Sequence, residues 1–139
     1  MLANITLSAK RAAPRACTRA PLTSLRYIHM SSPAFAVKEI TSATQFQNEV
    51  LKDKASFVDF YATWCGPCKA MSPFIEKFSD SYKDINFYQV DVDQFSDLSV
   101  EYGITAMPTF VLFKDGEVSL NSVGANPHAV ENMLKKGSQ

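Results

Sequence analysis

Two cysteines in the middle of the 139-residue chain are the residues with the clearest capacity for chemistry. Cys65 and Cys68 have the spacing C-x-x-C, whereas the third cysteine, Cys17, lies near the start of the chain. Two thiols cannot complete a four-ligand zinc site, and the one histidine beyond residue 35 is the distant His128, so no metal is expected. A disulfide between residues i and i+3 closes a very small loop, which argues against a purely structural crosslink. In a reducing compartment the pair therefore predicts redox chemistry.

The surroundings of the two cysteines predict different roles for them. Residues 55–62 are apolar at nearly every position, which indicates a strand buried on both faces, and residues 66–82 have the periodicity of a helix. Cys65 then lies at the N-terminus of that helix, where free N–H groups and the helix dipole stabilise a thiolate. Cys68 lies one turn later, within disulfide reach, and is expected to be more buried and to keep its proton longer. We expect Cys65 to attack a substrate disulfide and Cys68 to resolve the mixed disulfide.

Asp59 is the only charged residue in the apolar segment from Phe57 to Tyr61. A carboxylate inside a buried strand is costly to desolvate, so burial raises its pKa. Such a group can exchange a proton near neutral pH. The alternative is a carboxylate that faces solvent at the edge of the sheet.

The rest of the chain alternates between strand and helix patterns. Strands are predicted at 35–40, at 85–92 and in a hairpin of 109–113 and 118–123 turned at Asp115-Gly116; helices are predicted after Ser42, at 94–102 and from Pro127 to Leu134. This order predicts an α/β fold with a central mixed sheet of about five strands flanked by four helices. No apolar run approaches the roughly 20 residues of a membrane-spanning helix, so no membrane association is expected.

Residues 1–35 differ in composition from the rest of the chain. They hold five basic residues and no acidic one, and Arg11, Arg15 and Arg19 recur at a spacing that places them on one helix face. Such an arginine-rich, acid-free start is typical of a mitochondrial transit peptide. The stretch Arg26–Ser31 resembles the two-step mitochondrial cleavage pattern and places the mature start at Ala36. The alternatives are an N-terminal tail without a targeting role and a plastid address.

The predicted mature domain, residues 36–139, is mildly acidic. It holds nine of the 14 basic residues and all 14 acidic ones, and every arginine of the chain lies within the first 26 residues. A domain that lacks arginine and has excess negative charge is not expected to bind nucleic acid. We expect a monomer in the mitochondrial matrix.

Residues 36–139 resemble the thioredoxin family. The stretch Trp-Cys-Gly-Pro-Cys-Lys at residues 64–69 matches the active-site motif of that family without a change. Further matches are Val58-Asp59-Phe60, Pro73, Pro108-Thr109-Phe110, Gly116 and Gly124. The sequence departs from bacterial members at Tyr61, where they often carry Trp, and at Gln89, where they carry Lys.

The resemblance implies the thioredoxin fold and roles for individual residues. Cys65 and Cys68 would form the redox-active disulfide, and Asp59 would accept the proton of Cys68 during resolution. Pro108 would have a cis peptide bond that faces the active site. The substrate-binding rim implied by the resemblance comprises Trp64, Gly66, Pro67, Val92, Met107, Val123, Gly124 and Ala125. Met107 fits a packing role nearly as well.

The resemblance also implies partners and a place in cell redox homeostasis. The protein would hold no bound cofactor and would reduce disulfides of client proteins such as peroxiredoxins. Electrons would come from NADPH through a flavin-containing thioredoxin reductase. Gly66-Pro67 between the cysteines favours a reductase, because oxidases and isomerases more often carry His there and glutaredoxins carry Pro-Tyr. The alternative from another class is a non-catalytic thioredoxin-like module that only binds proteins.

Overall fold

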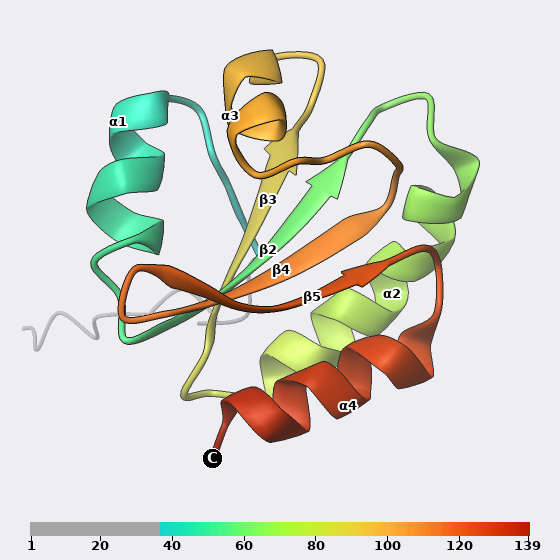
Figure 1. Ribbon diagram of the computed structural model, residues 1–139. Coiled ribbons are helices and arrows are strands. Elements are labelled where there is room, and N and C mark those ends of the chain that lie inside the picture. The colour runs from blue at the N-terminus through green and yellow to red at the C-terminus, as the bar shows by residue number, and fades with distance from the viewer. Residues whose placement is uncertain (1–36) are drawn as a thin grey trace, which may run out of the picture. The chain divides into compact units, whose positions relative to one another are not determined.

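The structure is a computed structural model that describes residues 37–139 (Figure 1). The strands are β1 (Lys38–Glu39), β2 (Ala55–Tyr61), β3 (Asn86–Asp91), β4 (Thr109–Lys114) and β5 (Glu117–Val123). The helices are α1 (Ala43–Gln45), the π-helix η1 (Phe46–Val50), α2 (Gly66–Ser81), α3 (Ser96–Glu101) and α4 (Pro127–Gly137). The predicted α/β order of elements is confirmed. The transit peptide and the cleavage before Ala36 concern residues outside the described range.

The five strands form one mixed sheet in the order β1-β3-β2-β4-β5. β3 runs parallel to both β1 and β2, whereas β4 is antiparallel to β2 and β5. Since β2 and β3 are parallel neighbours, their C-terminal ends lie side by side, and the segments that follow them leave the sheet at the same end of the strands. The cysteine motif follows β2, so the loop after β3 lies beside it.

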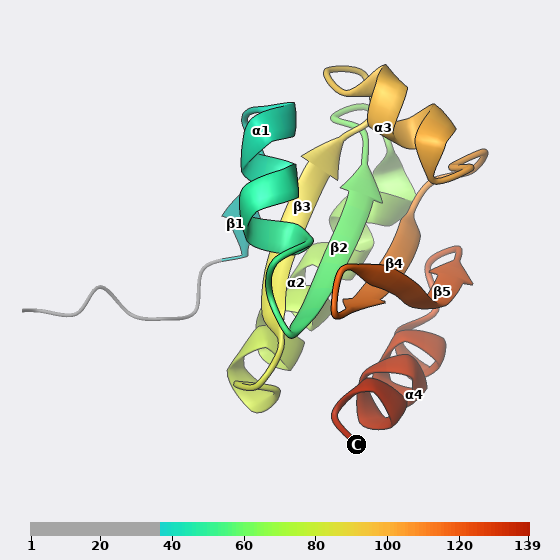
Figure 2. The ribbon, with the colours of Figure 1, turned by 60° about the vertical axis from the view of Figure 1, so that its left-hand side comes forward.

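Helices cover both faces of the sheet (Figures 1 and 2), and each face has its own apolar core. Val58 and Phe60 of β2 pack toward η1 and α3, whereas Phe57 packs toward α2 and α4. Side chains alternate along a strand, so Asp59 projects to the same face as Phe57, beneath α2. The strand that carries Asp59 is therefore buried on both faces, as predicted.

The helix predicted after Ser42 changes character along its length. The Ser42 hydroxyl accepts a hydrogen bond from the Gln45 N–H at 3.1 Å, as expected of a helix-capping serine. From Phe46 the helix widens to the π form, and the Leu51 N–H donates to the Phe46 carbonyl at 3.3 Å. The apolar spacing that predicts a helix does not distinguish these two forms.

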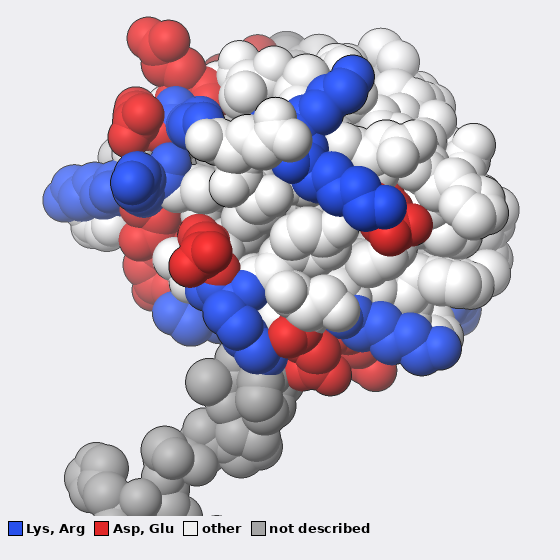
Figure 3. All heavy atoms as spheres, turned by 90° about the horizontal axis from the view of Figure 1, so that it is seen from below, with Lys and Arg blue, Asp and Glu red and all other residues white. Residues whose placement is uncertain are grey.

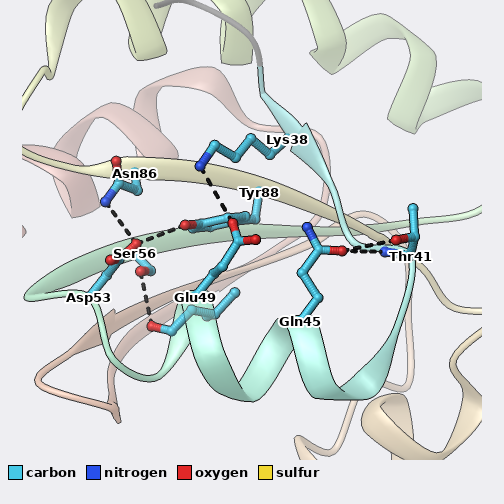
Figure 4. Close-up of polar contacts among 9 residues, drawn as sticks. Lys38, Thr41, Gln45, Glu49, Asp53, Ser56, Asn86 and Tyr88 are labelled. Carbon is cyan, nitrogen blue, oxygen red and sulfur yellow. Dashed lines mark hydrogen bonds and ion pairs between the residues drawn. The ribbon is translucent and has the colours of Figure 1, made fainter.

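Polar contacts fix this helix against the edge of the sheet (Figure 4). The Asp53 carboxylate accepts hydrogen bonds from the Asn86 amide and the Tyr88 hydroxyl, both at 2.7 Å. Lys38 of β1 pairs with Glu49 of η1 at 3.4 Å. The short strand β1 contributes only two residues to the sheet, which pair with Tyr88 and Gln89 of β3.

The β4–β5 hairpin turns at Asp115-Gly116, as predicted. Both residues have positive φ, and a Cβ on Gly116 would lie 2.7 Å from the carbonyl oxygen of Leu51. Glycine is therefore required there by conformation and by space. Among the described residues, no helix is long and apolar enough to cross a membrane.

Candidate active site

Cys65 and Cys68 form a disulfide at the first turn of α2, with Cα atoms 5.3 Å apart. Cys65 is the N-cap residue of the helix, and its Sγ accepts a hydrogen bond from the Cys68 N–H at 3.2 Å. This contact and the dipole of the 16-residue helix favour negative charge on the Cys65 sulfur when the pair is reduced. The local geometry is that of a pair that can pass between dithiol and disulfide.

The two cysteines do not differ in burial as expected. Cys65 is 4% exposed and Cys68 is 3% exposed, so in this disulfide form the two residues are buried to nearly the same extent. Ala62 is buried with them, and Tyr61, Val92 and Met107 pack against the cluster, so both residues are enclosed. Position on the helix separates their roles instead, because Cys65 caps α2 and Cys68 lies within it.

The rim of the site combines exposed apolar residues with a fixed loop. Trp64 is 66% exposed and Val123 is 61% exposed. The peptide bond between Met107 and Pro108 is cis, as expected, and the Gly124 N–H donates to the Pro108 carbonyl at 2.8 Å. These contacts hold the end of β5 beside the proline loop. Gly66, Pro67 and Ala125 are also exposed.

Asp93 is a site residue that the sequence analysis missed. The Trp64 indole nitrogen donates a hydrogen bond to the Asp93 carboxylate at 2.9 Å. The two residues are 29 positions apart, and only the parallel pairing of β2 and β3 brings the segments after them together. No local pattern in the sequence marks this contact.

Asp59 is buried in the centre of the sheet, so its alternative placement at a solvent-facing edge is wrong. It is 6% exposed, pairs in register with Gln89 of β3 and Phe110 of β4, and its Oδ1 atom has no hydrogen-bond partner among the described residues. Burial raises the pKa of Asp59 from 3.8 to about 7. The carboxyl group can therefore gain or lose a proton near neutral pH.

A cavity of about 270 Å³ connects Asp59 with Cys68. Its lining residues include Asp59 and Gln89 from the sheet and Cys68, Lys69 and Ser72 from α2. The cavity contains the Asp59, Gln89 and Ser72 side chains among a mostly apolar lining and is large enough for water, so water can bridge the Asp59 carboxyl group and the Cys68 sulfur. We call it the Cys68 cavity. It unites the predicted proton acceptor with the predicted resolving cysteine.

Charges of both signs are interspersed on the face of the described chain that Figure 3 shows from below. Lys54, Asp84 and Lys114 line a cavity of about 300 Å³ together with the C-terminal residue Gln139. Ala55, at the start of β2, lines the same cavity, whereas the cysteine motif follows the end of β2. This charged region therefore lies at the opposite end of the strand from the redox pair.

Comparisons with known proteins agree with the fold and the site. The thioredoxin family model matches residues 37–136, so the chain belongs to the thioredoxin family. It is 48% identical over 99 residues to Thioredoxin-1 of Schizosaccharomyces pombe, covering 71% of this chain and 96% of that one. It is 43% identical over 115 residues to the mitochondrial Thioredoxin-3 of Saccharomyces cerevisiae, covering 83% and 88%.

Solved structures show the same relationship. The crystal structure of Malassezia sympodialis thioredoxin has a TM-score of 0.73 at 42% identity, covering 81% of this chain and all of that one. Oxidised mitochondrial thioredoxin 3 of S. cerevisiae has a TM-score of 0.69 at 44% identity, covering 72% and 94%. A chain from work on thiol resolution in yeast mitochondrial 1-Cys peroxiredoxin via glutathione/thioredoxin systems has a TM-score of 0.70 at 42% identity, covering 76% and 99%.

Family and site geometry together define the activity. The protein has the thioredoxin fold and is a thiol–disulfide oxidoreductase that reduces protein disulfides through the Cys65–Cys68 pair. The alternative of a module that only binds proteins does not account for the helix-capped cysteine pair.

Proposed function

We propose that this protein reduces client disulfides in the mitochondrial matrix, with Asp59 as the proton acceptor for Cys68, and that NADPH-dependent thioredoxin reductase restores the dithiol. The chain itself carries the two electrons as a pair of thiols. The observation that carries the proposal is the cysteine pair at the first turn of α2 with Asp59 across a shared cavity.

In the first step the Cys65 thiolate attacks one sulfur of the client disulfide. A bond forms between Cys65 and that sulfur, the client's own S–S bond breaks, and the departing client thiolate takes a proton from solvent. The helix N-terminus favours this step because it stabilises the attacking thiolate.

In the second step Cys68 resolves the mixed disulfide. The Asp59 carboxylate takes the Cys68 proton, and the resulting thiolate attacks the Cys65 sulfur. The bond between Cys65 and the client breaks, and its electron pair leaves on the client's second sulfur, which is protonated by solvent. Two electrons have then passed to the client. A pKa of about 7 suits Asp59 to this task, because the group is close to half ionised at neutral pH.

The rim around the pair suits the binding of an extended client segment. Trp64 and Val123 offer exposed apolar surface, and Met107 packs against the cysteine cluster from the proline loop. We assign client contact to these residues together with Gly66, Pro67, Val92, Gly124 and Ala125. The structural neighbour from the peroxiredoxin study supports peroxiredoxins as one class of client.

Two observations support the mitochondrial assignment. Residues 1–35 have the composition of a transit peptide, and one relative of high coverage is a mitochondrial thioredoxin. We propose that the segment directs import and is removed, leaving residues 36–139 as the mature protein.

Reduction of insulin by NADPH and thioredoxin reductase tests the catalytic proposal. The full-length protein should accelerate NADPH oxidation in the presence of insulin, and Cys65→Ser should abolish the acceleration while remaining folded. If the protein reduces insulin after treatment with dithiothreitol but not with NADPH and thioredoxin reductase, the proposed electron donor is refuted and the reductase function is retained. Failure of both assays with a folded protein would refute the reductase function.

A further inference from the structure

A second cavity adjoins Asp59 on the side of α2 away from the cysteine pair. Its volume is about 470 Å³, and its lining residues are Val37, Asp59, Ser72, Ile75, Glu76, Asp80 and Gln89. We call it the β1–α2 cavity, because Val37 directly precedes β1 and four of the other residues lie on α2. Asp59, Ser72 and Gln89 line both this cavity and the Cys68 cavity. The three shared residues therefore mark the junction between the two spaces.

The three shared residues converge from different elements. Asp59 and Gln89 are register partners on β2 and β3. Ser72 lies one helical turn after Cys68, and its hydroxyl donates a hydrogen bond to the Cys68 carbonyl at 3.3 Å. A hydroxyl that donates one hydrogen bond can still accept others from water. Ser72 is exposed, whereas Asp59 is buried, so Ser72 lies between the carboxyl group and the surface of α2.

The Asp59 carboxyl group is incompletely hydrogen-bonded at the junction. Its Oδ1 atom is buried without a hydrogen-bond partner among the described residues, although the carboxyl group borders both cavities. Water in either cavity can satisfy such a buried polar atom. Asp59 must be ionised before it can accept the Cys68 proton, so a carboxyl group that already holds a proton has to lose it before the client is released, and water in one of the two cavities has to carry that proton.

We propose that this proton leaves through the β1–α2 cavity and that Ser72 positions the water that carries it. The inference rests on the proposed role of Asp59 as proton acceptor for Cys68. The Cys68 cavity opens beside Lys69 and Thr63, next to the motif that a bound client covers. The β1–α2 cavity opens beside Glu76 and Asp80, further along α2. Asp59 can therefore release its proton while the client still occupies the rim.

The charges around the junction favour this direction of release. The β1–α2 cavity has the Glu76 carboxylate of α2, which attracts protons, and Asp80, whose carboxylate pairs with Lys83 at 3.6 Å; the Cys68 cavity has the ammonium group of Lys69, which repels protons. The Glu39 carboxylate of β1 lies on the side of the Cys68 cavity, where it is already engaged by the hydroxyl of the lining residue Tyr61 at 3.3 Å. From β3, the facing group is the uncharged Gln89 amide.

Substitution of Ser72 tests the proposal. Ser72→Val removes the hydroxyl group. Ser72→Thr retains the hydroxyl group, and the Thr side chain has almost the same volume as that of Val. Ser81→Val is the matched control, because Ser81 is an exposed serine of the same helix and lines neither cavity. Single-turnover reduction of a labelled disulfide peptide by the reduced full-length protein is followed from pH 6 to 8, in water and in deuterium oxide. Ser72→Val should slow peptide release by about tenfold and increase the solvent isotope effect. Ser72→Thr and Ser81→Val should match the parent protein.

The same substitution in the Asp59→Asn background separates the possible outcomes. Because Ser72 acts through Asp59, Ser72→Val should have no additional effect on release in that background. An equal effect in both backgrounds, or no effect in either, would overturn the role of Ser72 while leaving that of Asp59 intact. Parental release rates in Asp59→Asn itself would refute the proton-acceptor role and the exit route together.

Discussion

The indole nitrogen of Trp64 donates a hydrogen bond to the carboxylate of Asp93 across 2.9 Å. This contact joins the active-site motif after β2 to the loop after β3. Trp64 is two-thirds exposed, so little packing fixes its ring, and the hydrogen bond sets the direction in which it extends over the rim. The loop after β3 thereby takes part in shaping the surface that meets the client.

We predict that Asp93→Ala increases the mobility of Trp64 and weakens client binding. Loss of one charge-assisted hydrogen bond at an exposed position corresponds to about 1 kcal/mol, or roughly a fivefold increase in KM for a protein client. The fluorescence anisotropy of Trp64, the only tryptophan of the chain, should fall. Asp97→Ala, which removes an exposed acid from α3, is the control and should alter neither value. An unchanged anisotropy in Asp93→Ala would contradict the assigned role.

The two cysteine variants are expected to lose activity at different steps of the reaction. Cys65→Ser removes the nucleophile, so no client becomes attached. Cys68→Ser retains the nucleophile but deletes the nearby second thiol, whose effective concentration external thiols cannot match. Mixed disulfides should therefore accumulate with Cys68→Ser in mitochondrial extracts and be released by dithiothreitol. Adducts with Cys65→Ser and none with Cys68→Ser would reverse the two roles.

Asp59→Asn should stabilise the oxidised protein at alkaline pH. The folded-state pKa of about 7 is above the ordinary value of 3.8, so the native state holds a proton that the unfolded state has lost between these two pH values. The free energy of unfolding of the parent protein should therefore fall by up to roughly 4 kcal/mol as pH rises from about 4 to above 7. The Asn variant should lack this decrease.

Urea unfolding of both oxidised proteins at about pH 5 and pH 8 measures the effect. The advantage of Asp59→Asn should be larger at pH 8, because the parent then buries a charged carboxylate. If the free energies of unfolding of the two proteins change with pH in the same way, Asp59 has an ordinary pKa in the folded state.

Residues 1–35 should be sufficient to direct import into mitochondria. Fused to a fluorescent protein, the segment should produce mitochondrial fluorescence, and mass spectrometry of the imported full-length protein should find a mature start near Ala36. Replacement of Arg11, Arg15 and Arg19 by Gln removes the positive face and should leave the fusion in the cytosol. A cytosolic location of the unaltered fusion would rule out targeting by this segment.

The sequence predicts best what depends on local spacing. The apolar run around Asp59 predicts its burial, and the C-x-x-C spacing at a helix start predicts the disulfide, because neighbours along a strand or helix determine both. The equal burial of the cysteines was not predictable in this way. It depends on Val92 and Met107, which the fold brings from later segments.

The missed residues have the same physical origin. Asp93 reaches Trp64 only through the pairing of two strands, and Ser72 gains its place only because two cavities meet beside it. Ser72 does lie one helical turn after Cys68, so its spacing indicates proximity to that cysteine. Spacing cannot indicate that empty space lies next to it.

The location of the C-terminus has a practical consequence for immobilising the protein. Gln139 lines the same cavity as Ala55 at the start of β2, whereas the redox pair follows Tyr61 at the far end of the same strand. A seven-residue strand spans roughly 20 Å, so an anchor attached beyond Gln139 leaves the cysteines facing away from a bead or an electrode. Affinity capture of clients and direct electrochemistry on the disulfide can both use that single attachment point.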